Sequence, residues 1–193
     1  MIEKLVTSFV GYQAKVGTMR EEDVDVYQYG YTLMIELFLN IIFSFVLGIL
    51  LGEVKEVFFF LCMFIPLRSF CGGYHAAKIW QCFIFSNLAV LVTIVFSKWM
   101  AGLDFVIAAC AFIEIVIIGL IWYLSPVDSD NKRMSFSEKK KMKIIATAII
   151  IIEVLVGDVV LYLGVKNMFC LLFLVHIIQI ISLVIVPEKK KDQ

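Results

Sequence analysis

The chain has 193 residues, of which 62% are hydrophobic and 18% charged, and its mean hydropathy is +0.96. A soluble domain of this size cannot bury so much apolar side chain, so the composition predicts an integral membrane protein. Seventeen Lys and Arg balance seventeen Asp and Glu, and this neutral charge gives no indication of nucleic-acid binding. Because no Pro-rich or Gly/Ser-rich linker divides the chain, we expect a single polytopic membrane domain over residues 1–193.

The N-terminal segment, residues 1–28, mixes acids and bases and has no long apolar run, so we expect no cleavable signal peptide. Its apolar residues recur at helical spacing, with charged residues between them: Ile2, Leu5, Val6, Phe9 and Val10. This pattern is typical of an amphipathic helix that lies in the membrane interface.

Apolar runs long enough to cross a bilayer follow in chain order, and they predict transmembrane helices at about 29–52, 79–97, 101–124, 144–165 and 167–186. The run at 54–67 is shorter because Arg68 ends it. It is predicted either as a short span from which Arg68 snorkels to the interface or as a re-entrant segment.

The distribution of basic residues favours the first alternative. With six crossings, only Lys55, Lys98 and Lys166 fall on one side of the membrane and every other Lys and Arg falls on the opposite side. Five crossings separate the basic residues less well. Since basic residues collect in the cytosol, we expect an all-α integral membrane protein with about six transmembrane helices and both termini cytosolic.

The five cysteines are odd in number and form no CxxC pair, so we expect free thiols rather than a disulfide framework or a zinc site. Neither a metal nor an organic cofactor is expected.

The segment 68–86 is the strongest candidate for chemistry, because a Gly72-Gly73 pair and His75 lie between Arg68 and Cys82. A thiol attacks only as its thiolate, and a neighbouring imidazole such as His75 can take its proton. Cys71 competes with Cys82 for this base, since it would stack on His75 at i, i+4 if the helix continued through the glycines. Spacing alone leaves both cysteines open. It also leaves open a purely structural role, with Cys82 as an apolar filler and His75 as an interfacial side chain.

These residues resemble a known family. Arg68, Gly72, Gly73, His75, Ala76, Cys82 and Ser86 are similar to the R-x3-G-G-x-H-A-x5-C-x3-S segment of the AgrB family, the membrane cysteine endopeptidases that process the AgrD pro-peptide of Gram-positive quorum sensing. The basic cytosolic loop expected at 125–143 resembles the Pro-Val-x3-Asn-Lys loop of the same family, and the length and six-span pattern also agree.

The resemblance implies a function. Cys82 would be the nucleophile and His75 its base, and the enzyme would release the acidic C-terminal tail of an AgrD-like pro-peptide through an acyl-thioester. A cysteine or serine of the peptide would then close a thiolactone or lactone ring. Substrate-binding or supporting roles would belong to Arg68, Gly72, Gly73, Ser86, Lys132, Arg133, Lys139, Lys140 and Lys141. The family also suggests a homodimer in the cell membrane of a Gram-positive bacterium.

Polar residues inside the predicted spans leave other hypotheses open. Glu36 could orient His75 as a third catalytic member. Alternatively, Glu114, Glu153 and Asp158 could carry protons in a small transporter or peptide exporter, although no inverted repeat is visible. A catalytically silent membrane scaffold is a third reading.

Overall fold

The computed structural model describes residues 2–17, 20, 23–73, 79–127 and 135–185. Its helices are α1 (Ile2–Lys15), α2 (Val24–Leu51), α3 (Val54–Cys71), α4 (Ile79–Ala101), α5 (Asp104–Leu124), α6 (Phe136–Tyr162) and α7 (Lys166–Val184). Contacts within the chain divide it into two compact units, residues 1–44 and 45–193, so that the boundary falls inside α2. The described residues include no strand, and the prediction of an all-α fold is confirmed for them.

The first unit consists of α1 and most of α2. Val6 and Val10 on α1 are buried. Gln28 donates a hydrogen bond to the hydroxyl of Thr7 (3.0 Å), and the rings of Phe9 and Tyr31 pack edge to face at 5.4 Å. The predicted N-terminal helix is therefore present and packs against α2, while its place in a membrane interface stays a prediction.

In the part of the chain that the structure describes, five helices are long and apolar enough to cross a membrane: α2, α4, α5, α6 and α7. Large apolar side chains cover their outer surfaces, as at Phe112, which is 82% exposed, and Ile115, which is 71% exposed. Side chains of this kind belong against lipid rather than water. The chain is thus a helical membrane protein.

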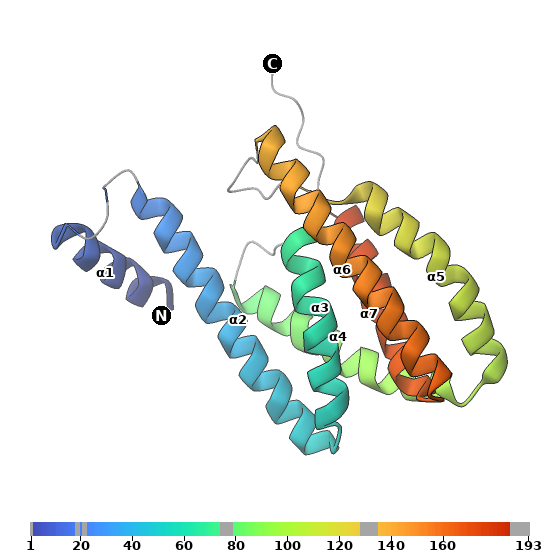
Figure 1. Ribbon diagram of the computed structural model, residues 1–193. Coiled ribbons are helices and arrows are strands. Elements are labelled where there is room, and N and C mark those ends of the chain that lie inside the picture. The colour runs from blue at the N-terminus through green and yellow to red at the C-terminus, as the bar shows by residue number, and fades with distance from the viewer. Residues whose placement is uncertain (1, 18–19, 21–22, 74–78, 128–134, 186–193) are drawn as a thin grey trace. The chain divides into compact units, whose positions relative to one another are not determined.

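Helix α3 continues beyond the expected limit of residue 67, through Arg68 to Cys71. At its start the side chain of Asn167, on the first turn of α7, donates to Glu56 (3.2 Å), and at its end Arg68 donates to Ser182, on the last turn of α7 (2.7 Å). Both ends of α3 thus lie beside the matching ends of α7, and the two helices run parallel (Figure 1). This pairing supports a full crossing by α3, although the count of six crossings stays a prediction.

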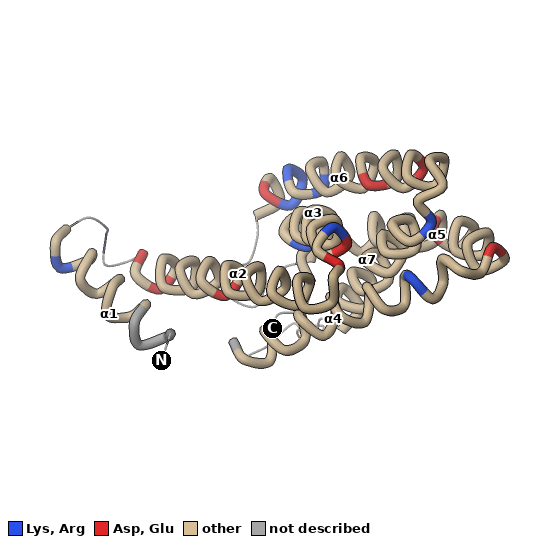
Figure 2. The backbone as a smooth tube through the Cα atoms, turned by 90° about the horizontal axis from the view of Figure 1, so that it is seen from below, with Lys and Arg blue, Asp and Glu red and all other residues tan. Residues whose placement is uncertain are grey.

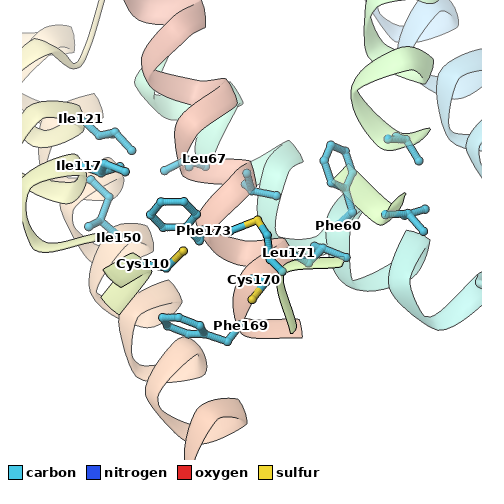
Figure 3. Close-up of a cluster of buried hydrophobic side chains, with 14 of the residues drawn as sticks. Phe60, Leu67, Cys110, Ile117, Ile121, Ile150, Phe169, Cys170, Leu171 and Phe173 are labelled. Atoms are coloured by element: carbon cyan, nitrogen blue, oxygen red, sulfur yellow. The ribbon is translucent and has the colours of Figure 1, made fainter. Parts of the chain in front are cut away.

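Helix α7 is the centre of the second unit. It contacts α3, α4, α5 and α6, and half of its apolar stretch is buried, compared with 17–28% in the other candidate spans. Figure 3 shows Phe169, Cys170, Leu171 and Phe173 of α7 among side chains of its neighbours, including Cys110 and Ile150. Polar groups on α7 are therefore placed between several helices at once.

Charged side chains are distributed differently at the two ends of this unit. At one end Lys98 pairs with Glu53, and Lys166 pairs with Asp104 (2.6 Å). At the opposite end Arg68 closes α3 and the basic residues of α6 begin (Figure 2). Two of the three lysines expected outside the cytosol are thus neutralised by carboxylates.

The expectation of a basic loop over 125–143 is wrong for its second half, because α6 begins at Phe136 rather than near residue 144. Ser135 caps the helix by accepting a hydrogen bond from the backbone of Glu138, whose carboxylate accepts one from the backbone of Ser135 (2.8 Å). This reciprocal pair satisfies two free N–H groups and starts the helix. The S-x-x-E pattern at 135–138 was the sequence signal for it.

Candidate functional site

The glycine pair forms a tight turn at the end of α3. Gly72 ends the helix with φ of +75° and donates its N–H to the carbonyl of Arg68 (3.0 Å), and Gly73 has φ of +143°. A β-carbon on Gly72 would lie 2.7 Å from the carbonyl oxygen of Val127, and one on Gly73 would lie 2.4 Å from Oγ of Ser182. Both the backbone conformation and the close contacts therefore require glycine at these positions.

Two side chains of α7 hold this turn. Gln179, which is fully buried, donates from Nε2 to the carbonyl oxygen of Gly72 (2.8 Å). Ser182 accepts a hydrogen bond from Nη1 of Arg68 (2.7 Å), and its hydroxyl is the atom that lies against Gly73. We refer to Arg68, Gln179 and Ser182 as the clasp. It fixes the backbone that leads directly into the segment containing His75.

The two motifs that resemble the AgrB family meet at this turn. The N–H of Val127 donates to the carbonyl of Cys71 (3.1 Å), so the start of the 125–143 region lies against the end of α3. Nζ of Lys143 donates to the carbonyl of Ser125 (2.6 Å) and to that of Trp122, and it also lies 4.4 Å from the centre of the Trp122 ring. The described parts of the two motifs, residues 68–73 and 125–127, therefore lie side by side.

The two competing cysteines have different surroundings. Cys71 is the last residue of α3 and is completely buried, whereas Cys82 lies in the first turn of α4 and is half-buried. Burial opposes ionisation of a thiol, while the first turn of a helix favours negative charge. Because α3 ends at Cys71, this residue also cannot stack on His75 along a continuous helix. The local structure thus favours Cys82 as the reactive thiol.

The remaining predicted site residues fall into three groups. Ser86 is half-buried and lies one turn after Cys82 on α4, and Lys139, Lys140 and Lys141 lie in the first two turns of α6. Glu36 belongs to the first unit, and its role stays a prediction. His75, Lys132 and Arg133 lie outside the described residues.

Sequence reasoning gave no role to Gln179 and did not single out Ser182. A signal was present, because His176, Gln179 and Ser182 recur every three residues in an otherwise apolar helix and therefore share one side of it. The pattern shows that α7 carries a polar side, but it does not show which helix that side contacts.

Comparison with known proteins decides the family. The sequence profile of the family described as "AgrB: Accessory gene regulator B" matches residues 2–183. The chain belongs to the AgrB family. This AgrB-family protein is also 28% identical over 147 residues to a protein of Clostridium perfringens (strain SM101 / Type A) named "Putative AgrB-like protein". The aligned region covers 72% of this chain and 66% of that relative, so it spans just under two thirds of the relative's length. No solved structure matches the chain.

Proposed function

We propose that this protein is a membrane cysteine endopeptidase that cleaves and cyclises an AgrD-like signal pro-peptide at the cytosolic face of the cell membrane. The observation that carries the proposal is the clasped Gly72–Gly73 turn, which brings both family motifs together and leads through a short segment containing His75 into the first turn of α4. The end of the bundle with most of the basic side chains is the cytosolic end in this proposal.

In the first chemical step, His75 takes the proton of the Cys82 thiol and the thiolate attacks a peptide carbonyl carbon. The C–N bond then breaks, the imidazolium returns the proton to the departing amine, and the acidic tail leaves. The rest of the peptide remains attached to Cys82 as a thioester. The helix dipole at the start of α4 favours the negative charge that develops on the reacting sulfur.

In the second step, a thiol or hydroxyl of the bound peptide attacks the thioester carbonyl. Its proton passes to the Cys82 sulfur, and the ring is released as a thiolactone or lactone. This outcome requires that water reach the thioester less readily than the peptide's own nucleophile. The half-buried position of Cys82 on an apolar helix supports such a restriction.

The basic side chains give the proposal its substrate preference. Lys139, Lys140 and Lys141 stand at the start of α6, directly after the 128–134 segment that contains Lys132 and Arg133. Together they offer a positive surface to the acidic tail and also attract anionic lipid headgroups. We also propose that the protein acts as a homodimer in the membrane of a Gram-positive bacterium, as the family resemblance suggests.

The proposal is tested with purified protein in liposomes and a full-length AgrD-like precursor, with tail release and the enzyme-bound thioester followed by mass spectrometry. Wild type and Cys62→Ala, which removes an exposed thiol of α3, are expected to release the tail and form the adduct. Cys82→Ala is expected to do neither, and His75→Ala is expected to slow both by at least about a hundredfold, as loss of a general base does. Tail release by Cys82→Ala would contradict the proposal and direct attention to Cys71 or to a transporter.

A further inference from the structure

A second polar cluster lies in the apolar core of α5, α6 and α7, one turn of α7 before Gln179 of the clasp. His176 on α7 is completely buried between two carboxylates. Its Nε2 lies 3.0 Å from Oε2 of Glu153 on α6, and its Nδ1 is within hydrogen-bond distance of Oε1 of Glu114 on α5. We call Glu114, His176 and Glu153 the buried triad. It takes no part in the proposed processing reaction.

The two contacts fix a minimum number of protons. A ring nitrogen without hydrogen and a carboxylate oxygen both present lone pairs, so each N···O contact must contain one proton. The buried triad therefore holds two protons. They form either an imidazolium between two carboxylates or a neutral imidazole that donates to one carboxylate and accepts from a carboxylic acid. In water at about pH 8 the same three groups hold only one, the single N–H of neutral imidazole.

No cation on the described parts of the neighbouring helices replaces this extra proton. On α3 the charged groups are Lys55 and Glu56 at the start and Arg68 at the end, and Arg68 is held by Ser182, about 9 Å along the axis from His176. Lys98 of α4 pairs with Glu53, and Lys166 of α7 pairs with Asp104 of α5.

The other titratable groups of these helices are thiols, the exposed Asp158, and the tyrosines, lysines and Glu138 near the ends of α5 and α6. Cys71 of α3 interacts electrostatically with Glu153, and Cys110 of α5 does so with Glu114 and with Cys170 of α7. On α6, Asp158 is exposed and the lysines precede Glu153 by at least ten residues, which is about 15 Å. Among the described groups, only protons are therefore available to offset the carboxylates of Glu153, which is buried, and of Glu114, whose side chain is 12% exposed.

A metal ion fits this cluster poorly. Both ring nitrogens of His176 already face carboxylates, so the imidazole has no lone pair left for a metal. Oε2 of Glu114 and Oε1 of Glu153 are buried and have no hydrogen-bond partner among the described residues. A buried carboxylate loses its hydration, which makes its charge unfavourable. A carboxyl group that is protonated or shares a proton therefore tolerates a buried oxygen without a hydrogen-bond partner better than an isolated carboxylate does.

We propose that Glu114, His176 and Glu153 form an intramembrane proton-binding site that retains two shared protons at mildly alkaline pH and joins α5, α6 and α7 through them. The ligand of this site is the proton itself. The site is independent of the peptidase reaction, so it stands even if Cys82 is not the nucleophile.

Because the chain contains two histidines, nuclear magnetic resonance of ¹⁵N-histidine-labelled protein can test the proposal. The His75→Gln variant in liposomes gives ring signals from His176 alone, and its infrared spectrum reports carboxylic acids. At pH 8 we expect either two protonated ring nitrogens, or one protonated nitrogen together with a carboxylic-acid band that Glu114→Gln or Glu153→Gln removes. The matched control, Asp158→Asn, changes an exposed carboxylate of α6 and should leave both spectra as they were.

One protonated ring nitrogen at pH 8 without a carboxylic-acid band from Glu114 or Glu153 would overturn the proposal. The proposal would also be overturned if one ring nitrogen were protonated and the carboxylic-acid band disappeared in Asp158→Asn. The band would then belong to Asp158, and the buried triad would hold one proton. The ring-nitrogen signals and the Asp158→Asn control come from a protein with an intact buried triad, and the Glu→Gln variants serve only to assign a carboxylic-acid band.

Discussion

At the scale of single residues, backbone conformation and burial distinguish positions that look equivalent in the sequence. Cys71 and Cys82 are two thiols near one histidine, yet one is enclosed at the end of α3 and the other is half-exposed in the first turn of α4. Gly72 and Gly73 likewise differ from the glycines inside helices, because each has a positive φ, and a β-carbon on either would also meet a close neighbour.

This difference predicts the effect of adding a methyl group. Gly72→Ala should lower the free energy of unfolding by about 1–3 kcal/mol for the backbone conformation alone, and contact with the Val127 carbonyl should add to this loss. Tail release should fall with it. The control is Gly119→Ala, on α5, where a β-carbon meets nothing within 4 Å and alanine favours the helix by up to about 1 kcal/mol. Thermal unfolding in detergent measures both; equal stabilities for the two variants would argue against the strained turn.

At the scale of secondary-structure elements, α7 supports the proposed catalytic segment with two side chains near its C-terminal end. The Gln179 amide satisfies the carbonyl of Gly72, and the Ser182 hydroxyl binds Arg68. Since α7 is the most buried helix, these groups are held by contacts with α3, α4, α5 and α6. The turn is thus attached by hydrogen bonds to a helix that four neighbouring helices hold in place.

Replacement of Gln179 by leucine tests this support, because the size is kept while the N–H donor is lost. An unsatisfied buried carbonyl costs about 1–3 kcal/mol, so we expect lower stability and slower tail release, with the fall in kcat exceeding the change in KM. The matched control is Asn167→Leu, which removes a side-chain hydrogen bond to Glu56 at the other end of the same helix. It should lower stability with little change in kcat. If both variants reduce kcat equally, Gln179 has only a structural role.

At the scale of the whole molecule, the basic residues of the second unit gather mainly at one of its ends. This uneven distribution predicts that this end faces the cytosol. Accessible single cysteines at Lys98→Cys and Lys141→Cys can be introduced after Cys62 and Cys82 are replaced by serine, because Cys71, Cys110 and Cys170 are buried. In intact cells a membrane-impermeant maleimide should label position 98 and reach position 141 only after permeabilisation. Labelling of position 141 in intact cells would reverse the proposed topology.

The sequence by itself determined the membrane class, the helices to within several residues at most ends, and the family. These features are local: hydropathy adds up along one segment, and the motifs lie within short stretches of chain. The extension of α3 beyond Arg68 and the early start of α6 were missed, because a charged side chain can extend to the interface and a capping box can begin a helix among lysines.

The tertiary structure alone decided which distant polar groups meet. Gln179 and Gly72 are 107 residues apart, Arg68 and Ser182 are 114 apart, and the buried triad draws one residue from each of three helices. An apolar helix can turn any side toward its neighbours, and hydropathy assigns no partner to a polar residue on it. The partner is chosen only when the helices pack, because a polar group in the membrane core must then find a hydrogen bond within the bundle.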